Sequence, residues 1–239
     1  MSDRKILLSW STGKDSAWAL HCLRKSGDGE IAGLMTTTTG EADQGRVTIH
    51  GICLATLQAQ ARAAGLGIRQ VHLPDPCPNS AYEAAMEDFV TTARADGITH
   101  IAFGDLFLED VRRYREDKLA GTGLEPIFPL WGRDTADLAR EMIEGGLRAR
   151  IVSVDTNQLD AAFLGRDFDD ALLADLPASC DPCGENGEFH SFCHAGPMFR
   201  EPVCIRMGRE RHKGQFVHVE PVSVAKPYFR LSAFQYFVP

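Results

Sequence analysis

Short apolar runs alternate with helix-like segments through the first half of the chain. Residues 6–8, 31–35, 68–73 and 99–103 have the composition of buried strands. The segments between them, ending at residue 24 and covering 51–64 and 80–96, have apolar residues at helical spacing. Repeated strand–helix units predict a Rossmann-like α/β fold, with a mainly parallel sheet covered by helices on both faces.

The second half has a more mixed pattern. We expect helices over residues 135–143 and 169–176 and strands over 149–154, 203–207 and 216–219, separated by loops rich in Gly, Pro and Cys. This pattern predicts a smaller α+β C-terminal domain. We place the domains at residues 1–131 and 132–239, with the boundary near residues 130–134.

Charge and cysteine usage exclude several classes of protein. A net charge of −8 over 239 residues argues against non-specific binding to nucleic acid or membranes. The N-terminal apolar run is too short for a signal peptide, and no run reaches the length of a membrane helix. Seven scattered cysteines, an odd number, indicate a reducing compartment, so we expect a cytoplasmic protein.

Three polar loops follow expected strands, at residues 9–16, 36–50 and 104–115. In a parallel sheet, ligands gather at the carboxyl ends of the strands. We therefore expect the three loops to lie together around one ligand-binding site at this edge of the sheet.

The first loop, Ser-Trp-Ser-Thr-Gly-Lys-Asp-Ser, suits an anion. It is not a P-loop, because Asp15 follows Gly13-Lys14 where Ser or Thr is needed, and Leu8 stands where the first glycine belongs. Backbone N–H groups at a helix N-terminus still attract phosphate, and Gly13 permits close approach.

Side chains of this loop add to the anion site. Ser9, Ser11 and Ser16 offer hydroxyl groups, and Lys14 offers a positive charge. Asp15 would repel a phosphate unless a cation lay between them, which implies magnesium. The alternative is an ordinary strand–turn–helix in which Asp15 or Ser16 caps the helix.

Residues 11–16 resemble the Ser-Gly-Gly-Lys-Asp-Ser loop of the PP-loop ATP pyrophosphatases, which convert ATP to AMP and pyrophosphate. Thr12 replaces the first glycine, a modest departure if its backbone is not left-handed. Residues 46–51, 104–131 and 181–192 resemble, in order, further signatures of the diphthine–ammonia ligase family within this superfamily, and the closest likeness is to its shorter bacterial members. The resemblance covers most of residues 5–199.

The resemblance implies an ATP- and Mg²⁺-dependent ligase that adenylates a carboxylate and passes the acyl group to ammonia. It implies an ATP-binding domain over residues 1–131 and a smaller substrate-binding domain over 132–239. The residues implied for the nucleotide are Ser9, Ser11, Thr12, Gly13, Lys14, Asp15, Ser16, Thr36, His50, Gly51, Gly104 and Arg115. Asp15 and Asp105 are implied for magnesium, and Arg112 is a further candidate for phosphate or an acidic substrate.

The implied catalytic residues are Lys14, Asp105, Glu185 and Glu188. We favour Glu188, with His190 beside it, for positioning ammonia, which arrives as ammonium and must lose a proton. The plain alternative is a glycine-containing turn with solvated acids. For Arg112 and Arg113 the alternative is that they lie on a solvated helix face. For His50 the alternative is that it caps the helix that follows.

Three alternatives in function stay open. Cys180 and Cys183, with His190, Cys193 and His194, could form a zinc site, although a clean second pair is missing. The same cysteines could serve RNA thiolation, against which the acidic chain argues. A non-catalytic ATP- or AMP-binding regulatory module would need the phosphate loop alone. The carboxylate substrate and a homodimer are left open.

Overall fold

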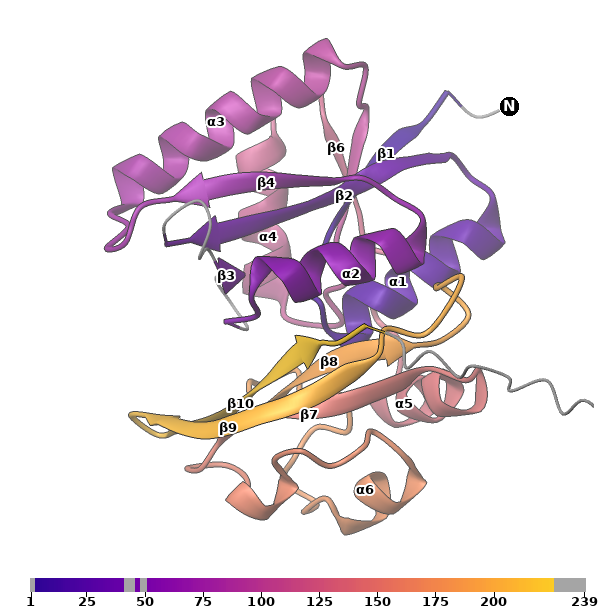
Figure 1. Ribbon diagram of the computed structural model, residues 1–239. Coiled ribbons are helices and arrows are strands. Elements are labelled where there is room, and N and C mark those ends of the chain that lie inside the picture. Colours follow the sequence, from indigo (N-terminus) through magenta and orange to yellow (C-terminus); the bar gives the residue numbers. More distant parts are fainter. Residues whose placement is uncertain (1–2, 41–45, 48–50, 226–239) are drawn as a thin grey trace, which may run out of the picture.

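The computed structural model describes residues 3–40, 46–47 and 51–225 (Figure 1). Strands of the first half are β1 (Lys5–Ser9), β2 (Glu30–Thr39), β3 (Arg46–Val47), β4 (Ile68–Leu73), β5 (His100–Ala102) and β6 (Glu125–Ile127). Its helices are α1 (Lys14–Ser26), α2 (Leu54–Ala64), α3 (Asn79–Ala95) and α4 (Glu109–Leu119). No helix in the described part of the chain is long and apolar enough to span a membrane.

The first sheet has the strand order β4-β2-β1-β5-β6, and these five strands are parallel. Only the short β3 runs antiparallel, beside the end of β2. The chain winds outward from β1 to β4 and then returns to β5 on the other side of β1. The winding therefore reverses between β1 and β5, which is where ligands bind in open α/β sheets.

Helices cover both faces of this sheet, which confirms the Rossmann-like prediction. Successive strand residues point to opposite faces, so Leu8 joins a core cluster with α1 and α2, whereas Leu7 joins one with α3 and α4. Both leucines are fully buried.

The second half forms an antiparallel sheet with the order β8-β7-β10-β9. Its elements are α5 (Thr135–Glu144), β7 (Arg148–Asp155), the 3₁₀ turn η1 (Ala161–Phe163), α6 (Asp170–Asp175), β8 (Phe189–Ala195), β9 (Ile205–Lys213) and β10 (Phe216–Ser223). This sheet lies on the side of the first sheet that carries α1 and α2 (Figure 1). The smaller α+β region predicted for the C-terminal half is confirmed.

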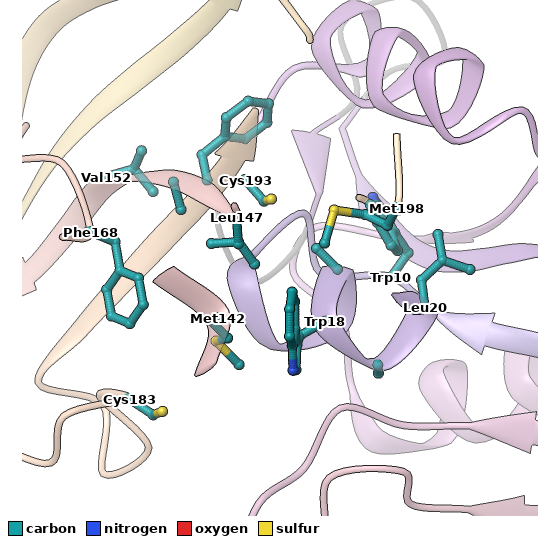
Figure 2. Close-up of a cluster of buried hydrophobic side chains, with 14 of the residues drawn as sticks. Trp10, Trp18, Leu20, Met142, Leu147, Val152, Phe168, Cys183, Cys193 and Met198 are labelled. Atoms are coloured by element: carbon teal, nitrogen blue, oxygen red, sulfur yellow. The ribbon is translucent and has the colours of Figure 1, made fainter. Parts of the chain in front are cut away.

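One cluster of buried side chains connects the two halves. Trp18 of α1, Met142 of α5 and Leu147, the residue before β7, all belong to this cluster (Figure 2). The expected boundary at residues 131/132 falls in the connection between β6 and α5. Helix α1 therefore packs against both sheets.

Several local predictions were wrong. Residues 36–39 were expected in a loop, but β2 continues to Thr39 because β4 pairs with it up to Leu73. Helix α1 begins at Lys14, and its N-cap is Gly13 rather than Asp15 or Ser16. The expected loop at 104–115 becomes α4 from Glu109 onward. Strands β6 and β8 were not predicted.

Candidate functional site

The loop between β1 and α1 is held by its own hydroxyl groups. Gly13 N–H donates to Ser11 Oγ (3.3 Å), and Ser16 Oγ donates to the Gly13 carbonyl (3.1 Å). The hydroxyl oxygens of Ser11 and Ser16 are 3.2 Å apart. Ser9 closes β1 just before this loop. The serines predicted for the phosphate site are thus brought together at the N-terminus of α1.

Thr12 occupies a left-handed backbone conformation, with φ of 75°, and its side chain is fully buried. A β-branched residue in this region is strained, which explains why glycine suits the position. Replacing the first glycine of the loop by threonine would be a modest change only if the backbone at this position were not left-handed. Because Thr12 is left-handed, the replacement is not modest.

Gln60 of α2 holds this strained turn in place. Its Nε2 donates to the carbonyls of Thr12 (3.0 Å) and Cys193 (2.6 Å), while its Oε1 accepts from Trp10 Nε1 (2.9 Å). The Cys193 N–H also donates to the Thr12 carbonyl (3.0 Å). Sequence reasoning missed Gln60. The available signal was an amide on the face of α2 that also carries Leu57.

Lys14 is buried and points toward the second half of the chain. Its ammonium donates to Asp15 (2.9 and 3.0 Å) and to the Cys183 carbonyl, and it lies 5.5 Å from the ring centroid of Phe189. Burial is the largest single influence and lowers the pKa of Lys14, but the charge and hydrogen bond of Asp15, together with the charges of Cys183 and Glu185, outweigh it, so this pKa lies above its ordinary value. The lysine therefore keeps its charge at neutral pH.

The loop after β5 approaches the start of α1 closely. A Cβ on Gly104 would lie 3.0 Å from the backbone of both Asp15 and Ser16, so only glycine fits without a shift. Asp105 forms two hydrogen bonds with Arg115, at 2.5 Å to Nε and 3.0 Å to Nη2. The acids predicted for magnesium thus lie on adjoining segments, Asp15 in the first turn of α1 and Asp105 in the loop after β5.

We call the region where the start of α1 adjoins the loop after β5 the mouth, and Glu185 approaches it from the second half of the chain. Its Oε1 accepts a hydrogen bond from the Leu106 backbone N–H (3.0 Å). Burial raises the pKa of Glu185 to about 7; the Leu106 N–H opposes the rise, and the charges of Asp15 and Asp105 add to it. A carboxyl group with this pKa can take up and release a proton near neutral pH.

Glu188 has a different environment in the same turn. Its side chain is 2% exposed and accepts hydrogen bonds from the backbone N–H groups of Asp181 (2.8 Å) and Asn186 (3.0 Å). These contacts hold the turn. His190 is half-buried, and burial followed by the charge of Lys14 lowers its pKa to about 4, so its ring is neutral.

The residues predicted near the adenosine are only partly placed. Thr36 is buried in β2, one residue beyond Met35, which pairs with Ser9 at the end of β1. Gly51 has a φ of 62° and accepts a hydrogen bond from Arg46 (2.7 Å). His50 lies outside the described residues.

Arg112 lies apart from the Asp105–Arg115 pair. It forms an i,i+4 ion pair with Glu116 (2.7 Å), and its guanidinium lies 4.7 Å from the ring centroid of Trp131. The ion pair with Glu116 is the one expected for a helix face, but Arg112 is half-buried against the ring, and its role toward phosphate or an acidic substrate stays a prediction.

The cysteines are all free. Cys180 Sγ donates to the Asp181 carbonyl (3.6 Å) and Cys183 Sγ to the Thr135 carbonyl (3.4 Å). Burial raises the pKa of Cys180 to about 12 and that of Cys183 further, so both thiols are protonated. Within residues 3–40, 46–47 and 51–225, no three His, Cys, Asp or Glu side chains are grouped to hold a metal ion.

The fold and this turn define a class of protein, the open α/β proteins that bind a ligand where the sheet reverses its winding. The reversal here lies beside a Ser-x-Gly-Lys-Asp-Ser turn that opens a helix.

Comparison with known proteins narrows the class. The family model described as "Diphthamide synthase C-terminal domain" matches residues 134–223. Human diphthine–ammonia ligase is 29% identical over 162 residues, which cover 65% of this chain and 60% of that protein. The Bos taurus protein of this name is 28% identical over 54% of this chain and 50% of its own length, and the Danio rerio protein 34% identical over 41% of each.

The chain thus spans 60% or less of the relatives it matches. The two comparisons confirm its likeness to the diphthine–ammonia ligase family.

Proposed function

We propose that the chain is an ATP-dependent amide ligase that forms AMP and pyrophosphate. In this reaction a substrate carboxylate attacks the α-phosphorus of ATP and expels pyrophosphate. Ammonia then attacks the acyl adenylate, giving the amide and AMP. The observation that carries the proposal is the hydrogen bond of Glu185 to Leu106, which fixes this carboxyl group to the loop after β5 where that loop adjoins the start of α1.

The start of α1 would bind the leaving pyrophosphate. Backbone N–H groups at a helix N-terminus and the hydroxyls of Ser9, Ser11 and Ser16 suit phosphate oxygens. The Lys14 ammonium adds a fixed charge nearby. Such preorganised donors stabilise charge that develops as the pyrophosphate leaves.

Asp15 and Asp105 would hold Mg²⁺ beside the phosphates. Carboxylates together with phosphate oxygens are the ligands this ion prefers, so the residues present fit it. In the structure each carboxylate forms an ion pair, Asp15 with Lys14 and Asp105 with Arg115. The ion would neutralise charge on the phosphates.

Glu185, rather than Glu188, would accept the proton that ammonium must lose. Its raised pKa and its position facing Leu106 suit this role, whereas Glu188 is engaged by the backbone of its own turn. The name of the relatives, diphthine–ammonia ligase, supports ammonia as the nitrogen donor.

The test is to incubate the protein with ATP, magnesium, ammonium and pooled carboxylic acids, and to separate AMP from ADP. We expect AMP and pyrophosphate that depend on a carboxylate, and amide only when ammonium is present. ADP would reject the mechanism. ATP binding without AMP formation would indicate a regulatory module instead, and loss of activity in Cys183→Ala would indicate sulfur transfer.

A further inference from the structure

A groove runs between α3 and α4 on the sheet face opposite α1 and α2. Its volume is about 660 Å³, which is in the range of small-molecule sites. The floor consists of Met35 of β2, Ile101 of β5 and Phe103, and Met86 and Val90 of α3 form one wall. The groove is therefore mainly apolar along its base.

The polar groups of the groove lie at its rim. Lys118 of α4 forms an ion pair with Glu83 of α3 (2.7 Å), which joins the two helices across the opening. Tyr82 and Tyr114 also line the groove, and Tyr114 is 46% exposed. An apolar base under a polar rim suits a ligand with an apolar body.

Arg115 connects the groove to the catalytic mouth. It lines the groove, and its guanidinium lies 4.3 Å from the ring centroid of Phe103. The same guanidinium holds Asp105, which follows Gly104 beside the start of α1. A ligand lying in the groove can therefore place one end beside the proposed phosphate site.

We propose that the groove binds the body of the acyl substrate, a small monocarboxylic acid with an extended aliphatic or aromatic chain. This inference rests on the proposed function. The carboxylate lies at Arg115, whose planar fork of N–H donors can serve a second carboxylate besides Asp105. The apolar chain lies over Met35, Ile101 and Phe103, excluding water from them.

The test measures binding of octanoate and 3-phenylpropionate by calorimetry without ATP, with acetate and octan-1-ol for comparison. Thr91 lines the groove, whereas its exposed neighbour Thr92 does not. We expect Thr91→Trp to weaken octanoate binding at least tenfold and Thr92→Trp to leave it unchanged. Equal effects of the two variants, or acetate binding as tightly as octanoate, would overturn the proposal.

Arg115→Gln provides the second variant. This variant should weaken the binding of octanoate at least tenfold and leave the binding of octan-1-ol unchanged, because only the acid presents a charge to the guanidinium. Equal weakening of both ligands would place the carboxylate elsewhere and reject the proposal.

The outcome is separable from that of the proposed function, because binding is measured without turnover. AMP formation from a polar acid that Thr91→Trp still accepts would overturn the groove proposal and leave the ligase activity standing. Octanoate binding with the expected variant pattern, but no AMP from any carboxylate, would support the groove and reject the ligase.

Discussion

At the scale of single residues, one turn contains two acids with different environments. Glu185 faces the mouth and has a pKa raised to about 7, whereas Glu188 accepts backbone hydrogen bonds that fix the turn. The sequence identified both acids but favoured Glu188. Which acid faces the mouth depends on how the turn packs against Leu106, and this contact spans 79 residues.

We predict that Glu185→Gln reduces amide formation by about 10²-fold or more, the usual contribution of a general base. In the native protein the rate should rise with pH and level off above about 7, because only the ionised carboxylate accepts a proton. The variant should lose this rise. Initial rates of AMP release from pH 5.5 to 8.5 would measure both effects.

Glu188→Gln is the matched control and should keep the pH dependence, since Glu188 does not face the mouth. If the rise of the rate with pH disappeared in Glu188→Gln and persisted in Glu185→Gln, Glu188 rather than Glu185 would be the proton acceptor.

Gln60 gives a second prediction at this scale. Gln60→Leu removes partners from the buried Thr12 and Cys193 carbonyls and from Trp10 Nε1. The Thr12 carbonyl keeps the Cys193 N–H as a donor. An unsatisfied buried group costs about 1–3 kcal/mol, so we expect the free energy of unfolding to fall by about 3 kcal/mol.

Urea denaturation would measure this loss, with Gln58→Leu on the exposed face of α2 as the control. Equal stability of the two variants would show that the Gln60 hydrogen bonds do not hold the loop.

At the scale of elements, the periodicity of the sequence predicts which segments are strands and which are helices. Where a strand ends depends instead on the strand that pairs with it. β2 continues through four threonines because β4 supplies hydrogen-bonding partners up to Thr39. β8 forms within a segment that has the composition of a loop, because β7 pairs with it from Arg148 to Val154. Local sequence contains neither partner, which is why these strands were missed or shortened.

The packing of the β5 loop against α1 yields a prediction. Gly104→Ala places a methyl group 3.0 Å from the backbone of Asp15 and Ser16, which cannot move without displacing α1. We expect the free energy of unfolding to fall by about 1–3 kcal/mol, as at other overpacked positions, and ATP binding to weaken.

Thermal unfolding and nucleotide titration would measure these effects. Gly67→Ala is the control, because a Cβ there meets nothing within 4 Å. If Gly104→Ala behaved like Gly67→Ala, the close approach of this loop to α1 would be refuted.

At the scale of the whole molecule, the two sheets share one core. Trp18 is 2% exposed, packs against Gly145 at the C-cap of α5 and donates from Nε1 to Glu141 (3.1 Å). Because α1 packs on both sheets, we expect the chain to unfold in one cooperative transition.

Trp18→Ala should lower the free energy of unfolding by about 3–5 kcal/mol and destabilise both sheets together. Hydrogen–deuterium exchange of peptides from β4 and β10 would test this, with the 46%-exposed Tyr114→Ala as a control. Protection lost in one sheet and kept in the other would mean that the halves unfold independently.

The sequence by itself determined the alternation of strands and helices, the residues of the phosphate loop and the family resemblance, because these depend on local spacing and residue type. Only the tertiary structure decided that Thr12 is left-handed, that Gln60 clamps it, and that Glu185 reaches the mouth. Those features depend on contacts between segments far apart in the chain, and no local pattern specifies which distant group will supply a hydrogen bond or bury a charge.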